Sequence, residues 1–253
     1  MNYSTYFSRG QKVFLINTSQ ERDESLFEAF SATIVNCDNR RFELRPRYTL
    51  HHGDSGHLSV GMRFKITAES YGSGVQFIGV IKAVYSHGFT MEPSGQMEMY
   101  QRAQAPRMDL LLGFRSFTKS APLAFFRSEW QRFTESIESG RTTRLELPST
   151  PVNIGVGGLR HVVGRSDHQT DLAMMFIDIG DSKPPVCAVA EQMWRRTLPE
   201  DDAVAIGRRF VLIRKCDQER IKTCIDLHRK KEKKDPFPER NNWELLDRMI
   251  YNR

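Results

Sequence analysis

A glycine run in the second half of the chain is the first feature whose residue types and spacing could bind a ligand. Residues 151–160 read PVNIGVGGLR, with three glycines inside four positions and an asparagine just ahead of them. Glycine admits backbone angles that other residues avoid, and it lets a ligand or a second strand come close. The run therefore predicts either a tight turn or a cradle for a ligand.

The run does not match the common phosphate-binding loops. No Gly-Lys-Ser or Gly-Lys-Thr follows it, and the next residues, LRHVV, have the composition of a strand. A P-loop needs that lysine, and a dinucleotide-binding loop needs a following helix whose N-terminus faces the phosphates. The sequence argues against both kinds of site.

A histidine-rich segment, residues 51–57, is the second candidate. It reads HHGDSGH and contains the GDSG tetrapeptide found around the nucleophile of chymotrypsin-like proteases. Those enzymes place a general base and an orienting aspartate well upstream of the serine, whereas only 54 residues precede Ser55. His51, His52 and His57 also lack the fixed spacing of metal ligands. We interpret the segment as a solvated loop that holds no metal.

The remaining polar residues do not form a recognisable active site. The four cysteines include no CxxC pair, which argues against a structural zinc site and a disulfide framework. Four aspartates of the second half lie in turn-like stretches, at Asp178, Asp181, Asp201 and Asp202. With no activated nucleophile and no matched acid and base, we predict a binding protein with no catalytic residues and no cofactor.

Short alternating strands are predicted to position these residues. From Lys12 to about Pro93, β-branched and aromatic residues recur at every second position in six segments, and six further segments follow after residue 106. Residues 186–196 fit a helix equally well on propensity. Helical spacing is clear at residues 121–139 and again from Asp217. The sequence predicts a mainly β chain of two small antiparallel β-barrels in tandem, the second with a C-terminal helix.

The turn-like stretch at residues 92–96 divides the chain. We place an accessory domain at residues 1–95, a second domain at 96–230 and a basic tail at 231–253. Residues 206–253 hold 14 of the 37 Lys and Arg but only 8 of the 31 Asp and Glu, so they carry the whole excess charge of +6. This excess favours an anionic partner. No leader-like segment or long apolar run occurs, so we expect a cytoplasmic protein without a membrane span.

The order of features in the second half resembles the PilZ domain. A basic segment at residues 100–107 precedes the strand MDLLLGF, then N-x-G-x-x-G, further strands and a C-terminal helix. PilZ domains are bacterial receptors for cyclic di-GMP, built on a six-stranded antiparallel barrel. Their signature is RxxxR followed by [D/N]xSxxG. Asn153 and Gly158 match the second element, and Gly155 stands where the family has serine.

The arginine element is shifted. Arg107 aligns with the second arginine of the signature, position 103 is alanine, and Arg102 lies one residue too far away. The resemblance implies that cyclic di-GMP, with two phosphodiester charges and two guanine planes, is bound without catalysis. The ligand-binding residues that we predict are Arg102, Arg107, Asn153, Gly155, Gly157 and Gly158.

A strand-rich domain ahead of a PilZ domain is similar to the arrangement in flagellar-brake proteins. This similarity implies that ligand binding changes how the two barrels pack and signals to a protein partner in motility, pilus or polysaccharide control. Two alternatives remain open: an interaction module of PilZ type that binds no nucleotide, and a basic nucleic-acid-binding β protein that uses residues 206–253.

Overall fold

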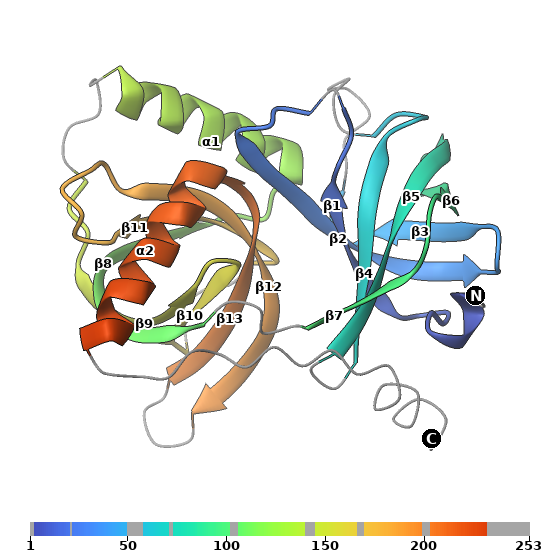
Figure 1. Cartoon of the computed structure of the whole chain (residues 1–253). Helices are drawn as coiled ribbons and strands as arrows, with labels where there is room; N and C mark the ends of the chain where they lie inside the picture. The colour runs from blue at the N-terminus through green and yellow to red at the C-terminus, as the bar shows by residue number, and fades with distance from the viewer. Residues whose placement is uncertain are drawn as a thin grey trace. The chain divides into compact units, whose positions relative to one another are not determined.

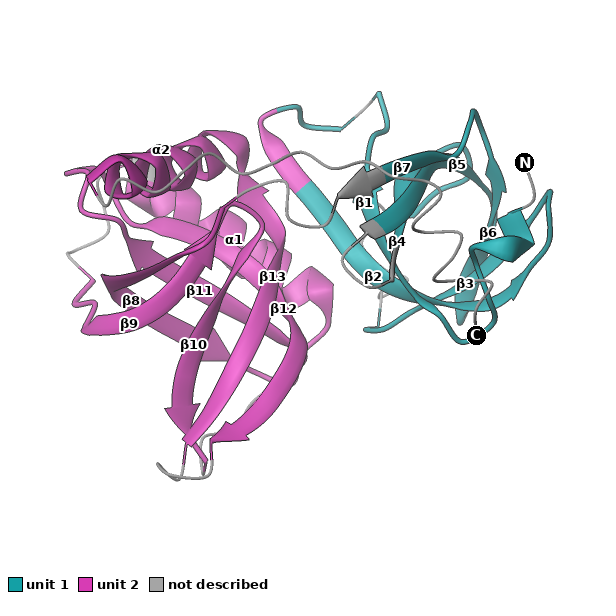
Figure 2. Cartoon of the chain, turned by 60° about the horizontal axis from the view of Figure 1, so that its bottom comes forward, with its two compact units in different colours: residues 1–24, 28–104, 237–253 teal, residues 25–27, 105–236 magenta. Residues whose placement is uncertain are grey.

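The computed structural model describes residues 3–20, 22–49, 58–70, 73–101, 106–139, 145–165, 170–198 and 203–231. Within these ranges the chain is mainly β, with thirteen strands and two α-helices (Figure 1). The described residues form two compact units (Figure 2). Unit 1 runs to residue 101, apart from residues 25–27, and unit 2 contains residues 25–27 and the described residues from 106 to 231.

Unit 1 is a set of antiparallel strands whose pairings form a closed circuit. β1 pairs with β2 and β4, β4 with β5, β5 with β6, β6 with β3, and β3 with β2. The rings of Phe7, Phe42 and Phe77 meet in its core, with centroids 4.9 to 5.4 Å apart. The elements are a 3-10 turn at Tyr3–Thr5, β1 (Lys12–Asn17), β2 (Leu26–Cys37), β3 (Phe42–Pro46), β4 (Arg63–Ser70), β5 (Ser73–Tyr85), β6 (Gly88–Pro93) and β7 (Glu98–Gln101).

Unit 2 is a closed six-stranded antiparallel barrel. Its strands follow the order β8, β9, β10, β13, β12 and β11, and β11 pairs with β8 to close the circle. Alternate residues fill the interior, among them Met108, Ile154 and Phe210. The strands are β8 (Met108–Thr118), β9 (Ser149–Gly155), β10 (Gly158–Gly164), β11 (Leu172–Asp178), β12 (Val186–Leu198) and β13 (Ala203–Arg214). The predicted antiparallel barrel with a C-terminal helix is confirmed here.

Two helices pack on this barrel. α1 (Leu123–Glu138) covers the outer face of β11 and β12, where the Trp130 indole N–H donates to the carbonyl of Cys187 at 2.8 Å. α2 (Lys215–Lys231) follows β13 directly, and its Ile221, Cys224 and Ile225 are part of the barrel core. Both helices were predicted from their 3.6-residue spacing. Within the described residues, no helix combines the length and the apolar character that a membrane span requires.

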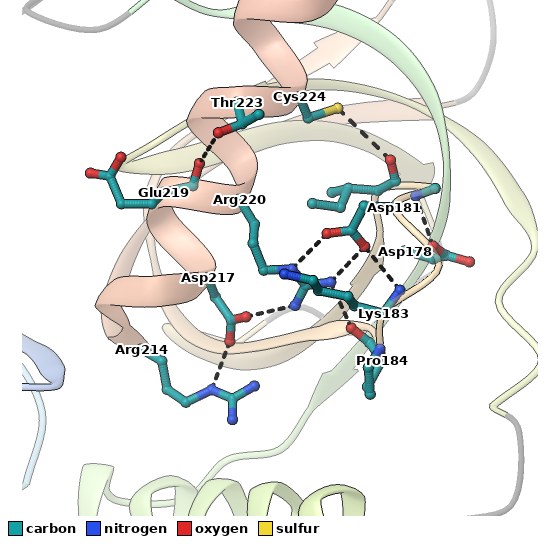
Figure 3. Close-up of polar contacts among 12 residues, drawn as sticks. Asp178, Asp181, Lys183, Pro184, Arg214, Asp217, Glu219, Arg220, Thr223 and Cys224 are labelled. Carbon is teal, nitrogen blue, oxygen red and sulfur yellow. Dashed lines mark hydrogen bonds and ion pairs between the residues drawn. The ribbon is translucent and has the colours of Figure 1, made fainter.

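An arginine in the second turn of α2 ties the helix to the loop between β11 and β12 (Figure 3). The Arg220 guanidinium donates to both carboxylate oxygens of Asp181 at 2.8 Å, to Asp217 at 2.7 Å and to the carbonyl of Pro184 at 2.9 Å. Asp217 is buried and also accepts from Arg214 at 2.9 Å. The Arg220 hydrogen bond lowers the pKa of Asp181. The aspartate assigned to a turn from the sequence therefore anchors α2.

The structure decides one segment that the sequence left open between strand and helix, and it adds one strand that the sequence did not predict. Residues 186–196, for which a helix fitted equally well, lie in β12, because this strand pairs with both β11 and β13 and is needed to close the barrel. Strand β7 was not predicted. It pairs with β5 and lies beyond residue 95, where the sequence suggested a domain boundary, so the described residues change unit between 101 and 106.

His161 of β10 points into the barrel and is only 2% exposed. Among the described residues, none forms a hydrogen bond with its Nε2 atom. Burial, and secondly the charge of Arg208, lowers the pKa of His161 to about 4. The unfolded chain takes up this proton near pH 6.5, so folding stability is lost as pH falls from about 6.5 toward 4. The expected loss between pH 7 and pH 5 is about 2 kcal/mol.

Denaturant unfolding of the whole chain at pH 7 and at pH 5, followed by circular dichroism, measures this loss. His161→Met should remove most of the difference between the two pH values, because methionine fills similar space and carries no proton. The matched control is His87→Gln, at an exposed histidine of unit 1, which should leave the difference unchanged. If the His161→Met variant still loses about 2 kcal/mol, another group is responsible.

Candidate ligand-binding site

The β9–β10 hairpin carries the glycine run, and its two-residue turn is formed by Val156 and Gly157. The backbone N–H of Phe210 in β13 donates to the carbonyl of Gly157 at 2.9 Å. The side-chain amide of Gln218 in α2 donates to the carbonyl of Val156 at 3.3 Å. The turn is thus held from two sides, which fixes the ends of both strands.

Gly158 marks a close approach between β10 and β13. A Cβ atom at this position would overlap the carbonyl oxygen of Arg208 and would lie 2.9 Å from the Cα of Arg209. The residue also has a φ of 155°, which side chains disfavour. The final glycine of the signature is therefore required by the barrel itself.

Arg107 lies across the hairpin, immediately before β8. Its Nε donates to the side-chain oxygen of Asn153 at 2.8 Å, and its Nη2 donates to the backbone carbonyls of Asn153 at 3.0 Å and Gly158 at 3.4 Å. Its stem passes over Gly155, where a Cβ would lie 3.0 Å from the Arg107 Cγ. Glycine at position 155, in place of the signature's serine, gives the arginine room to lie flat on β9.

The register places Asp109, Asn153 and Arg160 in one row across β8, β9 and β10. Their neighbours in the chain, such as Met108, Ile154 and Leu159, point into the core, so this row lies on the outer face of the barrel. The same oxygen of Asp109 accepts from the amide of Asn153 at 3.0 Å and from the guanidinium of Arg160 at 3.1 Å. Four polar side chains, counting Arg107, therefore form one connected group.

The row continues onto β13 and β12. Arg160 pairs with Gly207, and Gly207 pairs with Trp194. A Cβ on Gly207 would overlap the Trp194 indole, so the ring lies flat against the barrel at this glycine, and the tryptophan is still 43% exposed. An aromatic plane open to solvent thus lies on the same face as the polar group.

This outer face, made of Arg107, Asp109, Asn153, Arg160 and Trp194, is called the signature face below. Guanidinium groups can donate two parallel hydrogen bonds to a phosphate or to the O6 and N7 of guanine, and an asparagine amide can pair with a base edge. An exposed indole can stack on a base. The face therefore offers groups for a phosphodiester and for a planar base.

The structure brings most of the predicted site residues together. Arg107, Asn153, Gly155 and Gly158 lie within one hydrogen-bonded and packed group. Gly157 is exposed on the turn, and nothing lies within 4 Å of its potential Cβ. Arg102 lies outside the described residues, as does the HHGDSGH segment.

Asp109, Arg160 and Trp194 were not predicted as site residues. The two-residue alternation of the strands does put Asp109, Asn153 and Arg160 on outward positions. Their alignment into one row depends on the register between strands, which alternation within a strand cannot provide. Trp194 lies 34 residues after Arg160 in the chain and reaches the face only because β12 and β10 both pair with β13.

No group of three His, Cys, Asp or Glu side chains in the described ranges could hold a metal ion. All four cysteines are free thiols, and Cys187 and Cys224 are buried. Burial raises the pKa of the Cys224 thiol, which keeps it protonated.

Comparison with known proteins gives structural matches only. No protein-family model and no curated protein matches the chain. The Bacillus subtilis inhibitor of motility MotI/DgrA matches over 89% of this chain and 99% of its own, at 15% identity and a TM-score of 0.37. MrkH of K. pneumonia in complex with c-di-GMP matches over 89% and 90%, at 14% identity and a TM-score of 0.32.

YcgR of Escherichia coli, also solved in complex with c-di-GMP, matches over 87% of this chain and 86% of its own, at 12% identity and a TM-score of 0.32. Two of these solved structures thus contain c-di-GMP. What this chain binds has to be inferred from the residues of its candidate site.

Proposed function

We propose that unit 2 is a receptor for cyclic di-GMP that binds the nucleotide on the signature face and catalyses no reaction. The single observation that supports this most is the placement of Arg107 over the hairpin, hydrogen-bonded to Asn153 and Gly158. These three residues are the parts of the PilZ signature that the sequence retains. Arg107 precedes Asn153 by 46 residues in the chain but is bonded to it in the fold.

The chemistry of the face fits the ligand. Cyclic di-GMP is an anion with two phosphates, and Arg107, just before β8, and Arg160, on β10, are exposed cations on either side of β9. Arg107 and Asn153 can also reach guanine edges, while Trp194 offers a stacking plane. Burying a planar base against an indole and pairing phosphates with guanidinium groups uses each of these side chains for the interaction that it performs best.

The segment that joins the two units ends next to Arg107 in the chain, which suggests how binding is relayed. A ligand that engages Arg107, and also Arg102 within the joining segment, would restrict the angles open to the two units. We propose that a protein partner recognises the chain in this restricted state. The inter-unit change and the partner are both parts of the proposal.

Isothermal titration calorimetry of the whole chain with cyclic di-GMP tests the proposal. We expect saturable binding of cyclic di-GMP, much weaker binding of GMP and of linear diguanylate, and no tight binding of a single-stranded oligonucleotide. Absence of heat at saturating cyclic di-GMP would overturn it and favour the interaction-module alternative. Tight oligonucleotide binding that falls steeply with salt would favour the nucleic-acid alternative instead.

Trp194 provides a more specific prediction for the same site. Trp194→Ala should weaken cyclic di-GMP binding about tenfold, because stacking of one base on an aromatic ring contributes about 1–3 kcal/mol. Trp194→Phe should keep most of the affinity. The control is Phe117→Ala on β8, since Phe117 has a similar exposure of 44% and lies outside the signature face. Equal affinities for Trp194→Ala and the natural chain would remove the indole from the site.

A further inference from the structure

The signature face contains one carboxylate, and it occupies the groups that an anionic ligand needs. Asp109 Oδ1 accepts from the Asn153 amide at 3.0 Å and from the Arg160 guanidinium at 3.1 Å. Both donors belong to the cross-strand row at the centre of the face. A phosphate oxygen that approached the same two donors would have to take the place of this carboxylate oxygen.

We propose that the Asp109 carboxylate competes with a phosphodiester for the Asn153 and Arg160 donors. It thereby lowers the affinity of the site and raises the ligand concentration at which the receptor is half-occupied. The inference rests on the proposed function. The Asp109 carboxylate holds Asn153 and Arg160 in the geometry that an anionic oxygen requires. When cyclic di-GMP binds, its phosphate displaces that carboxylate, which turns toward solvent.

The Asp109–Arg160 ion pair is exposed to solvent, which makes replacement of the carboxylate by a phosphate feasible. The side chain of Asp109 is 76% exposed and that of Arg160 is 48% exposed. Ion pairs in such surroundings contribute little stability and open readily, because water solvates the separated charges well. The structural role of Asp109 in the barrel is therefore small, and its negative charge next to an anion site is the larger effect.

A second role for Asp109 makes the opposite prediction. A carboxylate that stayed in place could accept hydrogen bonds from the N–H groups of a guanine edge and would then increase affinity. The observed contacts favour the competitor, because the carboxylate already bonds to the two donors that suit a phosphate. Removing the charge of Asp109 distinguishes the two roles by the sign of the change.

The test compares cyclic di-GMP affinities of the natural chain and of Asp109→Asn by calorimetry at one salt concentration. Asp109→Asn keeps the size of the side chain and an oxygen acceptor but removes the charge. We expect binding to become about fivefold to tenfold tighter, because a repulsion of about 1 kcal/mol between the Asp109 carboxylate and the ligand phosphate is removed. The matched control, Asp226→Asn on the exposed side of α2, makes the same charge change and should leave affinity unaltered.

A double-mutant cycle tests whether Asp109 acts through the donors that it occupies. In an Arg160→Ala background, Asp109→Asn should give a smaller gain, because one of the two donors that it releases is missing. Weaker binding by Asp109→Asn would show that the carboxylate contacts the ligand, and unchanged binding would show that it is only a surface charge. Either result overturns the inference while binding by the natural chain still supports the proposed function. Failure of both proteins to bind would overturn the function itself.

Discussion

Replacement of Gly158 by alanine is expected to destabilise unit 2 by about 4 kcal/mol or to prevent its folding. The added Cβ would overlap the backbone carbonyl of Arg208 and crowd the Cα of Arg209, and neither can move without opening the β10–β13 pairing. Overpacking against backbone and an unfavourable φ each cost about 1–3 kcal/mol. Their sum approaches the whole stability of a typical domain.

Gly157→Ala is the matched control, one residue away in the same hairpin. Nothing lies within 4 Å of its potential Cβ, so its stability should change by less than about 1 kcal/mol. Denaturant unfolding measures both variants, and hydrogen exchange of the Phe210 amide, which donates to Gly157, reports on the β10–β13 contact. Similar stabilities for the two variants would mean that the strands can separate at Gly158 without cost, contrary to this explanation.

Most strands and both helices could be predicted from the sequence. Alternation of apolar residues located every strand except β7, and helical spacing located both helices, because these periods are imposed by local geometry. β7 is only four residues long, and its place depends on pairing with β5, a contact distant in the chain. Alternation also indicated β12, but its local propensity fitted a helix equally well, so its pairing with β11 and β13 decides the assignment.

In the candidate site too, some residues could be predicted from local sequence and others only from the pairing of distant strands. The signature resemblance predicted Arg107, Asn153 and Gly158 as site residues, and it also implied that Gly155 replaces a hydrogen-bonding serine. The structure adds a steric reason for that glycine, namely the Arg107 stem that lies over it. Asp109, Arg160 and Trp194 lie on three strands and meet only through the register, so no local pattern could connect them.

Gly158 and Arg107 illustrate two different reasons for a residue to occur in one signature. Gly158 permits the barrel to close and faces the backbone of β13. Arg107 is exposed and precedes the first paired residue of β8, so its side chain takes no part in the strand pairing of the barrel, although it bonds to the hairpin. Stability and ligand affinity should therefore separate when the two positions are changed.

Arg107→Ala is expected to weaken cyclic di-GMP binding about a hundredfold or more, while the chain stays folded. Hydrogen bonds to a charged group contribute about 1.5–3 kcal/mol each, and a forked arginine can make two of them to a phosphate or to guanine. Arg107 now makes its bonds to Asn153 and Gly158, so it is already positioned on the face and need not be ordered anew when the ligand arrives.

Two further variants separate charge from geometry in this prediction. Arg107→Lys keeps the positive charge but cannot form the planar fork, so its affinity should lie between those of the natural chain and Arg107→Ala. Arg132→Ala, at an exposed arginine of α1 that pairs with Glu129, removes the same charge outside the signature face and should bind normally. Calorimetry gives the affinities, and thermal unfolding checks that each variant is folded. If Arg107→Ala lowers the unfolding temperature but leaves the affinity unchanged, Arg107 holds the hairpin in place and does not bind the ligand.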